Sequence, residues 1–217
     1  MKRISLLAFI TIAFTALMAL TSNLALAQTA APKAATLTDA ERKEAIKYLQ
    51  QTRNNFLAEI KGLSEAQWKF KSAADRWSVA EVAEHIAVSE ESLMSLVTER
   101  IMKSPATPEK KEAAKGKDAQ LRQRVMDRST KVQAPETLKP TNRWATKADL
   151  AKAFNGSRDK TVNYIKTSQE DLRSHFGPHP LLKDLDAYQW ILLISSHSAR
   201  HTDQIKEVKA DPNFPKK

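Results

Sequence analysis

Apolar residues recur at intervals of three and four along four long segments of this chain, and polar residues fill the positions between them. This spacing is typical of amphipathic helices, whereas the period-two alternation that would indicate half-buried strands is absent. Glycine, which interrupts regular helices, occurs only four times in 217 residues. We therefore predict an all-α fold.

Capping residues indicate where the first two helices begin. Thr38 opens a capping box, and we expect the helix that follows it to end near Gly62. Ser78 and Glu81 form a second box, which opens a helix that stops before Pro105. The positions expected on the buried faces of these two helices are Ile46, Leu49, Arg53, Phe56, Ile60, Val82, His85, Ile86, Ser89, Leu93, Leu96 and Val97.

Two further helices are predicted in the last third of the chain. Thr146 caps the third, whose apolar repeat continues to Leu172, before the breaker run at residues 177–180. Asp186 caps the fourth, with Gln189 three residues later. The positions expected on their buried faces are Leu150, Phe154, Ser157, Thr161, Tyr164 or Ile165, Ser168 and Leu172, and then Trp190, Ile194, His197, His201, Ile205 and Val208.

Four amphipathic helices of this length predict a four-helix bundle. The connection between the second and third helices spans residues 104–143 and is strongly charged at 109–117. A connection of this length is either a crossover that lets these two helices run parallel or a partly ordered flap. One more short helix is expected within it, on Leu121, Val125 and Met126.

The N-terminus has the pattern of an export signal. Lys2 and Arg3 are followed by an uncharged apolar run at residues 4–20 and a small-x-small cleavage site at 25–27. The run is close in length to an uncleaved membrane anchor, but the polar residues after it and the cleavage site favour removal. We expect an exported protein, periplasmic or extracellular, with no stable membrane anchor after cleavage. The expected domains are a signal peptide at 1–27, a flexible N-terminal segment at 28–37, a four-helix bundle at 38–210 and a C-terminal tail at 211–217.

Composition narrows the chemistry that this chain can carry. Cysteine is absent, so the protein has no disulfide, and any metal must be bound by His, Asp or Glu. The formal net charge of +10 predicts a basic surface, but the lysines are scattered and do not cluster with aromatic residues. We therefore expect a solvated surface and no specific nucleic-acid partner. A basic adaptor for anionic cell-envelope polymers stays open as an alternative, and so does a homodimer.

Three histidines occupy positions where bundle helices normally bury leucine. His197 and His201 lie in the core stripe of the fourth helix, one turn apart, so their imidazoles can converge on one ion. His85 lies on the buried face of the second helix, and facing helices are where bundle proteins build metal sites. We predict a three-histidine metal site. In the alternative, each histidine is a neutral core residue hydrogen-bonded to a carbonyl or a hydroxyl.

Two other histidines have the same spacing but are not expected to lie on one face of a helix. His175 and His179 are four residues apart, but Gly177, Pro178 and Pro180 prevent a regular turn between them. We expect these two histidines in a surface loop and not as a ligand pair.

Three neutral imidazoles leave a divalent ion, zinc or nickel, with an incomplete coordination sphere. The remaining position has room for water or an atom of a small-molecule substrate, so hydrolysis and thiol transfer are both available. Glu81, one turn before His85, and Gln204, three residues past His201, are candidates to orient a ligand or accept a proton. The capping box already accounts for Glu81. Trp77 is expected to wall the pocket.

The residues around these histidines resemble the DinB-like superfamily. The likeness covers nearly all of the mature chain and extends to connecting segments at 134–140, 172–173 and 179–180. The two segments that carry it are Trp77-Ser78-Val79-Ala80-Glu81-Val82-Ala83-Glu84-His85-Ile86 and His197-Ser198-Ala199-Arg200-His201-Thr202-Asp203-Gln204-Ile205.

The resemblance implies a four-helix bundle that binds a divalent metal through His85, His197 and His201. Members of the superfamily include thiol-dependent transferases, a thiol-dependent isomerase and metal-dependent hydrolases, so we expect one of these activities or, in the alternative, a non-catalytic metal-binding module. This chain departs from the common pattern at Ser198, where a glutamate is frequent, and in its export signal. The export signal favours hydrolysis over thiol transfer, because small thiols are scarce in oxidising compartments.

Overall fold

The computed structural model describes residues 36–129 and 131–216. The predicted signal peptide and all but the end of the predicted flexible segment lie outside the described residues. At that end, Leu37 is only 4% exposed and belongs to the hydrophobic core. The hydrophobic core therefore includes a residue that precedes the first helix.

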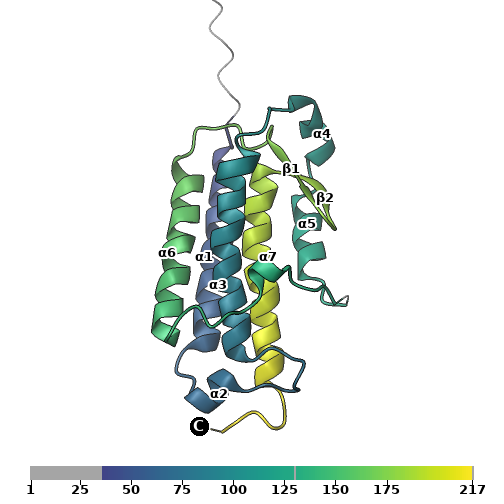
Figure 1. Cartoon of the computed structure of the whole chain (residues 1–217). Coiled ribbons are helices and arrows are strands. Elements are labelled where there is room, and N and C mark those ends of the chain that lie inside the picture. Colours follow the sequence, from purple (N-terminus) through teal and green to yellow (C-terminus); the bar gives the residue numbers. More distant parts are fainter. Residues whose placement is uncertain (1–35, 130, 217) are drawn as a thin grey trace, which may run out of the picture. The chain divides into compact units, whose positions relative to one another are not determined.

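Four long helices within the described residues confirm the predicted bundle (Figure 1). They are α1 (Asp39–Ile60), α3 (Val79–Leu96), α6 (Lys147–Thr167) and α7 (Ala187–Lys209). Helix α7 packs against α1 and α3, and α6 packs against the same two helices from the opposite side. Each helix therefore has two neighbours in the bundle, and α3 and α7 share one interface.

The order of the elements makes neighbouring helices parallel in two cases. In Figure 1, α1 and α7 run toward the end of the bundle where α2 (Glu65–Lys69) lies, whereas α3 and α6 run away from it. The long connection after α3 thus returns the chain to the α2 end before α6 begins. It is the crossover that we predicted, and most of it is folded.

Short helices occupy much of this crossover. The predicted one is confirmed as α5 (Asp118–Met126), which packs against α7. A π-helical turn, η1 (Val97–Ile101), directly extends α3. The remaining elements are the short helix α4 (Lys111–Ala114) and two 3-10 turns, η2 (Pro108–Lys110) and η3 (Glu136–Leu138). In Figure 1 the η3 turn crosses in front of α3 and α7.

A two-stranded antiparallel hairpin precedes α7, and the sequence did not predict it. Strand β1 (Phe176–His179) pairs with β2 (Lys183–Asp186), with Gly177 opposite Leu185. The predicted third helix is also too long, because α6 ends at Thr167 instead of continuing to Leu172. Leu172 is nevertheless fully buried, in the segment between α6 and the hairpin.

Local sequence explains where the helices begin. Thr38, Ser78 and Asp186 each form the capping box expected of them, and Thr146 accepts a hydrogen bond from the Asp149 backbone nitrogen. These caps satisfy backbone N–H groups that a helix leaves without partners in its first turn.

On α1 and α6, a buried polar residue is the sequence neighbour of the one predicted. Thr52, not Arg53, is buried on α1, and Arg158, not Ser157, is buried on α6. Arg158 is 0% exposed and forms a bidentate ion pair with Glu90 on α3, at 2.6 and 2.7 Å. A buried charge is tolerated only when it is paired and hydrogen-bonded, which is the case here.

The predicted C-terminal tail folds back onto the bundle. The Phe214 ring lies 5.4 Å from the Phe70 ring, and the Pro215 carbonyl accepts a hydrogen bond from Gln67. Across residues 36–129 and 131–216, no helix combines the length and apolar character needed to span a bilayer.

Candidate metal centre

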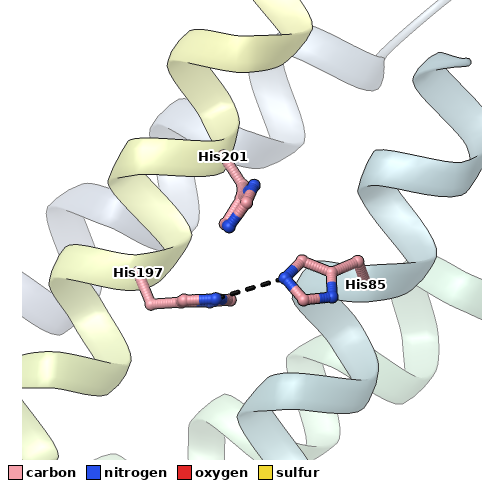
Figure 2. A group of neighbouring side chains, drawn as sticks. All are labelled: His85, His197 and His201. Carbon is pink, nitrogen blue, oxygen red and sulfur yellow. Dashed lines mark hydrogen bonds between the residues drawn. The ribbon is translucent and has the colours of Figure 1, made fainter. Parts of the chain in front are cut away.

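Helices α3 and α7 bring His85, His197 and His201 together (Figure 2). The three ring centroids lie 4.4 to 4.9 Å from one another. One nitrogen from each ring belongs to a set in which all distances are within 4.8 Å. His85 Nε2 and His197 Nε2 are 3.2 Å apart. The helical spacing that predicted this cluster therefore holds in three dimensions.

Hydrogen bonds at the outer nitrogens fix the tautomers of two rings. The Leu138 carbonyl lies 2.8 Å from His85 Nδ1 and can only accept, so this nitrogen carries the hydrogen. Gln204 Oε1 lies 2.8 Å from His201 Nδ1 and likewise accepts from it. Both rings are therefore left with a lone pair on Nε2, the nitrogen available to a ligand.

The spacing of these nitrogens suits a tetrahedral divalent ion. Metal–nitrogen bonds of ~2.0–2.1 Å at tetrahedral angles place neighbouring ligand nitrogens about 3.3 Å apart. The 3.2 Å between His85 Nε2 and His197 Nε2 is close to that value. Three imidazoles with no further protein ligand are the donor set of an open site.

The surroundings keep these imidazoles neutral. Burial lowers the pKa of His85, although the bond to Leu138 opposes the shift. Burial also lowers the pKa of His197 well below its ordinary value, and repulsion from the other two imidazoles and from Arg200 adds to this effect. For His201, burial first and then repulsion from His85, Arg200 and Arg128 lower the pKa to about 3, although the bond to Gln204 opposes the shift. Neutral imidazole is the form that binds metals.

The site is closed on the α3 side and open on the α7 side. His85 is 2% exposed, whereas His197 and His201 are only half-buried. The half-buried indole of Trp77 lies 5.0 Å from the His85 ring. Trp77 is thus beside the site, where the sequence placed it.

Comparison with known proteins places these features in a family. The sequence model of the DinB superfamily matches residues 48–205, a range that includes all three histidines. The chain belongs to the DinB superfamily. The resemblance seen in the sequence is therefore confirmed.

Sequence comparison and structure comparison each find proteins similar to this DinB chain. The uncharacterized protein YuaE of Bacillus subtilis (strain 168) is 29% identical over 151 residues, which cover 70% of this chain and 88% of YuaE. YfiT from Bacillus subtilis, described as a probable metal-dependent hydrolase with an unusual four-helix bundle topology, has a TM-score of 0.54 at 13% identity and covers 83% of this chain and 92% of its own. TT2238, described as a four-helix bundle protein, has a TM-score of 0.48 at 18% identity, with 76% and 98% covered. The likeness to YfiT supports the shared fold.

The two polar candidates beside the histidines have different positions in this DinB fold. Gln204 contacts His201 directly, as expected of a residue that orients a ligand. Glu81 points elsewhere, because one carboxylate oxygen accepts from the Ser78 backbone at 2.7 Å and the other from Lys71 at 2.8 Å. Glu81 therefore acts as a helix cap, the role that the capping box had already given it.

Residues near the DinB histidines in sequence also differ in their surroundings. Ser198, at the position where a glutamate is frequent in the superfamily, accepts a hydrogen bond from Arg158 in the core at 2.9 Å. His175 and His179 flank or form strand β1 and are half-buried, which corrects their assignment to a surface loop. His175 Nδ1 bonds to the Ser104 carbonyl, and the His179 ring lies 5.4 Å from that of Trp190. Neither belongs to the three-histidine group.

Sequence reasoning missed Glu84, which precedes His85. Its carboxylate is 5% exposed and accepts hydrogen bonds from the backbone nitrogens of three consecutive residues, 141–143, at 2.7, 3.0 and 3.1 Å. A signal was available in the sequence, since this glutamate stands among mostly apolar residues at 82–88 in a predicted helix. A charge in such a run requires partners.

Proposed function

We propose that this DinB protein binds one divalent metal ion, zinc or nickel, through His85, His197 and His201, and uses it to hydrolyse a small-molecule substrate. The observation that carries the proposal is the convergence of three imidazole nitrogens within 4.8 Å of one another. The lone pairs on Nε2 of His85 and His201 support it, because both outer nitrogens are already occupied by acceptors.

A divalent ion in such a site supplies Lewis acidity, which lowers the pKa of water and polarises a substrate oxygen. The protein's contribution is to hold neutral imidazoles in place and to leave one side open. His197 and His201 keep contact with solvent on the α7 side, so a substrate can approach from there. Trp77 offers an apolar surface next to His85 for the organic part of that substrate.

Hydrolysis is preferred to thiol transfer for two reasons. YfiT, which shares the fold, is described as a probable metal-dependent hydrolase. The N-terminal sequence also has the pattern of an export signal, and small thiols are scarce outside the cytosol. We accordingly propose that the mature protein begins at Gln28 and acts in the periplasm or outside the cell. Fractionation of the producing cells and N-terminal sequencing of the product test this directly.

A second candidate function is metal binding without catalysis. It is favoured by the hydrogen bonds and the ion pair that already occupy the two glutamates closest to His85 in sequence. Glu81 is bound to Ser78 and Lys71, and Glu84 is bound to residues 141–143, so neither carboxylate is aimed at a substrate as a general base.

Metal analysis of untagged protein tests the shared part of both proposals. We expect about one divalent ion per chain in the wild type and a large loss in His201→Ala. His175→Ala is the matched control, because His175 lies outside the cluster and should keep the metal content of the wild type. Equal metal content in the wild type and His201→Ala would rule out the site.

Substrate screening then separates hydrolase from binder. Metal-loaded and chelator-treated protein are compared on ester, amide and thiol-transfer substrates. We expect turnover of an ester or amide that disappears on chelation and returns with zinc or nickel. Full metal loading with no turnover on any of these substrates would favour the binding module, and salt-sensitive retention on an anionic polymer would favour the adaptor.

A further inference from the structure

Residues 138–143, which we call the clamped segment, end the crossover and lie against α3 beside the metal site. Two consecutive residues of α3 hold this segment. His85 Nδ1 donates to the Leu138 carbonyl, and the Glu84 carboxylate accepts from residues 141–143. The contact between α3 and the clamped segment thus fixes both the orientation of His85, a proposed metal ligand, and the path of residues 138–143.

The Glu84 carboxylate sits in a nest of backbone N–H groups. Its Oε1 accepts from the nitrogens of Thr141 and Arg143 and from the Thr141 hydroxyl at 3.2 Å, while Oε2 accepts from the Asn142 nitrogen. Asn142 has φ of 60°, the left-handed conformation that lets consecutive N–H groups turn toward one anion. A non-glycine residue keeps this conformation only where its surroundings stabilise it. The carboxylate is that stabilising partner.

Within residues 36–129 and 131–216, the outer nitrogen of His85 has the Leu138 carbonyl as its acceptor, and a backbone carbonyl moves only if its segment moves. If residues 141–143 were released, the Leu138 carbonyl would lose its anchor three residues away. His85 would then be free to rotate or to place its hydrogen on Nε2, the nitrogen that a metal requires without a hydrogen.

We propose that Glu84 is a positioning residue for the metal site: it holds residues 141–143, keeps the Leu138 carbonyl on His85 Nδ1, and so directs His85 Nε2 toward the ion. The proposal rests on the proposed metal binding. It also implies that zinc binding and the order of residues 141–143 are coupled. Because such coupling is reciprocal, a segment that raises zinc affinity when it is ordered must become more ordered when zinc binds.

Metal affinity of Glu84 variants tests the proposal. Zinc is titrated into untagged, metal-free protein in competition with a chromogenic chelator. We expect Glu84→Asp to weaken zinc binding by about 10- to 100-fold, as does loss of other groups that orient metal ligands. This variant keeps the negative charge but its shorter side chain cannot reach all three backbone nitrogens. Glu84→Gln, which removes the charge as well, should weaken binding at least as much.

Glu91→Gln is the control for charge. Glu91 lies on the same helix and contacts the same segment, but only through an exposed ion pair with the Arg143 side chain at 3.0 Å. Zinc affinity in this variant should stay within about twofold of the wild type. Wild-type affinity in Glu84→Asp, or an equal loss in Glu91→Gln, would overturn the positioning role.

Hydrogen exchange on the wild type tests the coupling even if Glu84→Asp fails to fold. Zinc should slow exchange of the amides of residues 141–143, and exchange that is identical with and without zinc would contradict the proposal.

Nitrogen NMR of the metal-free protein separates this inference from the proposed function. The wild type should show His85 with its hydrogen on Nδ1, and Glu84→Asp should move part of the population to Nε2. If the wild type binds no zinc, the metal site fails, while this NMR result still decides whether Glu84 positions His85. If zinc binds and the His85 tautomer is the same in both proteins, only the positioning role fails.

Discussion

His85 and His201 each donate a hydrogen bond from Nδ1, but the two acceptors differ in kind. His85 uses the Leu138 backbone carbonyl, whereas His201 uses the Gln204 side-chain amide one turn along its own helix. The amide can be changed by mutation without moving the backbone. It therefore gives direct access to the effect of ligand orientation.

We predict that Gln204→Leu weakens zinc binding by about tenfold or more, because the His201 Nδ1–H loses its acceptor and its ring loses a fixed orientation. Gln204→Glu keeps an acceptor at the same place and should bind zinc at least as tightly as the wild type. Chelator competition measures both. Equal affinities in all three proteins would show that Gln204 does not orient the ring.

Stability of the metal-free protein should fall as the solution is acidified. The folded-state pKa values of His85, His197 and His201 lie below that of an unfolded chain, about 6.5. The unfolded state therefore binds more protons below pH ~6.5, and stability is lost as pH falls through this value, by at most about 1.4 kcal/mol per pH unit for each imidazole.

Urea unfolding between pH 8 and pH 6, in the presence of a chelator, measures this effect.

Asp186 changes stability with pH in the opposite direction. Burial raises its pKa to about 6, so ionising it in the folded state costs stability between pH ~4 and ~6. Asp186→Asn keeps the polar cap and removes that contribution. Stability that rose from pH 7 to pH 6 in Asp186→Asn would contradict the lowered imidazole pKa values.

At the scale of single residues, sequence predicted the ligands but not all of their partners. His197 and His201 were found because helical spacing places them on one face, and Gln204 because it is one turn away. The acceptor of His85 is a backbone carbonyl at the end of the η3 turn, 53 residues away, and such a group leaves no mark on the sequence. Arg158 was missed because the repeat that runs through Leu150 and Phe154 continues at Ser157. The sequence does not show that Glu90 pairs with Arg158 in the core, which makes burial of the charge tolerable.

Among the elements, the hairpin before α7 shows what local pattern cannot predict. Its strands have four residues each, and β1 carries glycine and proline, which are poor strand formers. Tertiary contacts hold it instead, since the Trp190 indole nitrogen donates to the Gly177 carbonyl at 3.3 Å. The four long helices, by contrast, carry caps and periodic apolar faces in their own sequence.

Gly177 is a hairpin residue that packs closely against Ile101. A Cβ atom at this position would lie 2.8 and 2.9 Å from two carbons of the buried Ile101 side chain. We predict that Gly177→Ala lowers the free energy of unfolding by about 1–3 kcal/mol, as overpacking of a core does. Urea unfolding checks it.

Gly156→Ala is the matched control. Gly156 lies inside α6, and its added Cβ would meet nothing within 4 Å. Alanine should therefore stabilise the protein, by up to about 1 kcal/mol, through its higher helix propensity. If both substitutions had the same sign, the close contact at Gly177 would not be the cause.

Across the whole molecule, one buried guanidinium joins all four long helices. Arg158 on α6 pairs with Glu90 on α3, donates to the Leu49 carbonyl and the Thr52 hydroxyl on α1, and donates to Ser198 on α7. Ser198 follows a proposed metal ligand directly. The same network that closes the core therefore contacts the helix turn that carries His197.

We predict that Arg158→Met destabilises the protein by about 3–5 kcal/mol, because Glu90 is left as a buried charge without its partner. The double variant Arg158→Met, Glu90→Leu should recover most of this loss. Arg53→Met, which breaks a more exposed pair with Asp159, should cost about 0–1 kcal/mol. A single and a double variant of equal stability would exclude the ion pair as the cause.

The two sides of the proposed metal site come from helices that lie far apart along the chain. His85 and His197 are 112 residues apart, and the second of them sits on the last helix of the chain. A nascent or truncated chain that lacks α7 keeps only His85 of the three proposed ligands. The proposed site can therefore form only once the last helix has docked, and the metal supply that would load it is that of the compartment in which docking takes place.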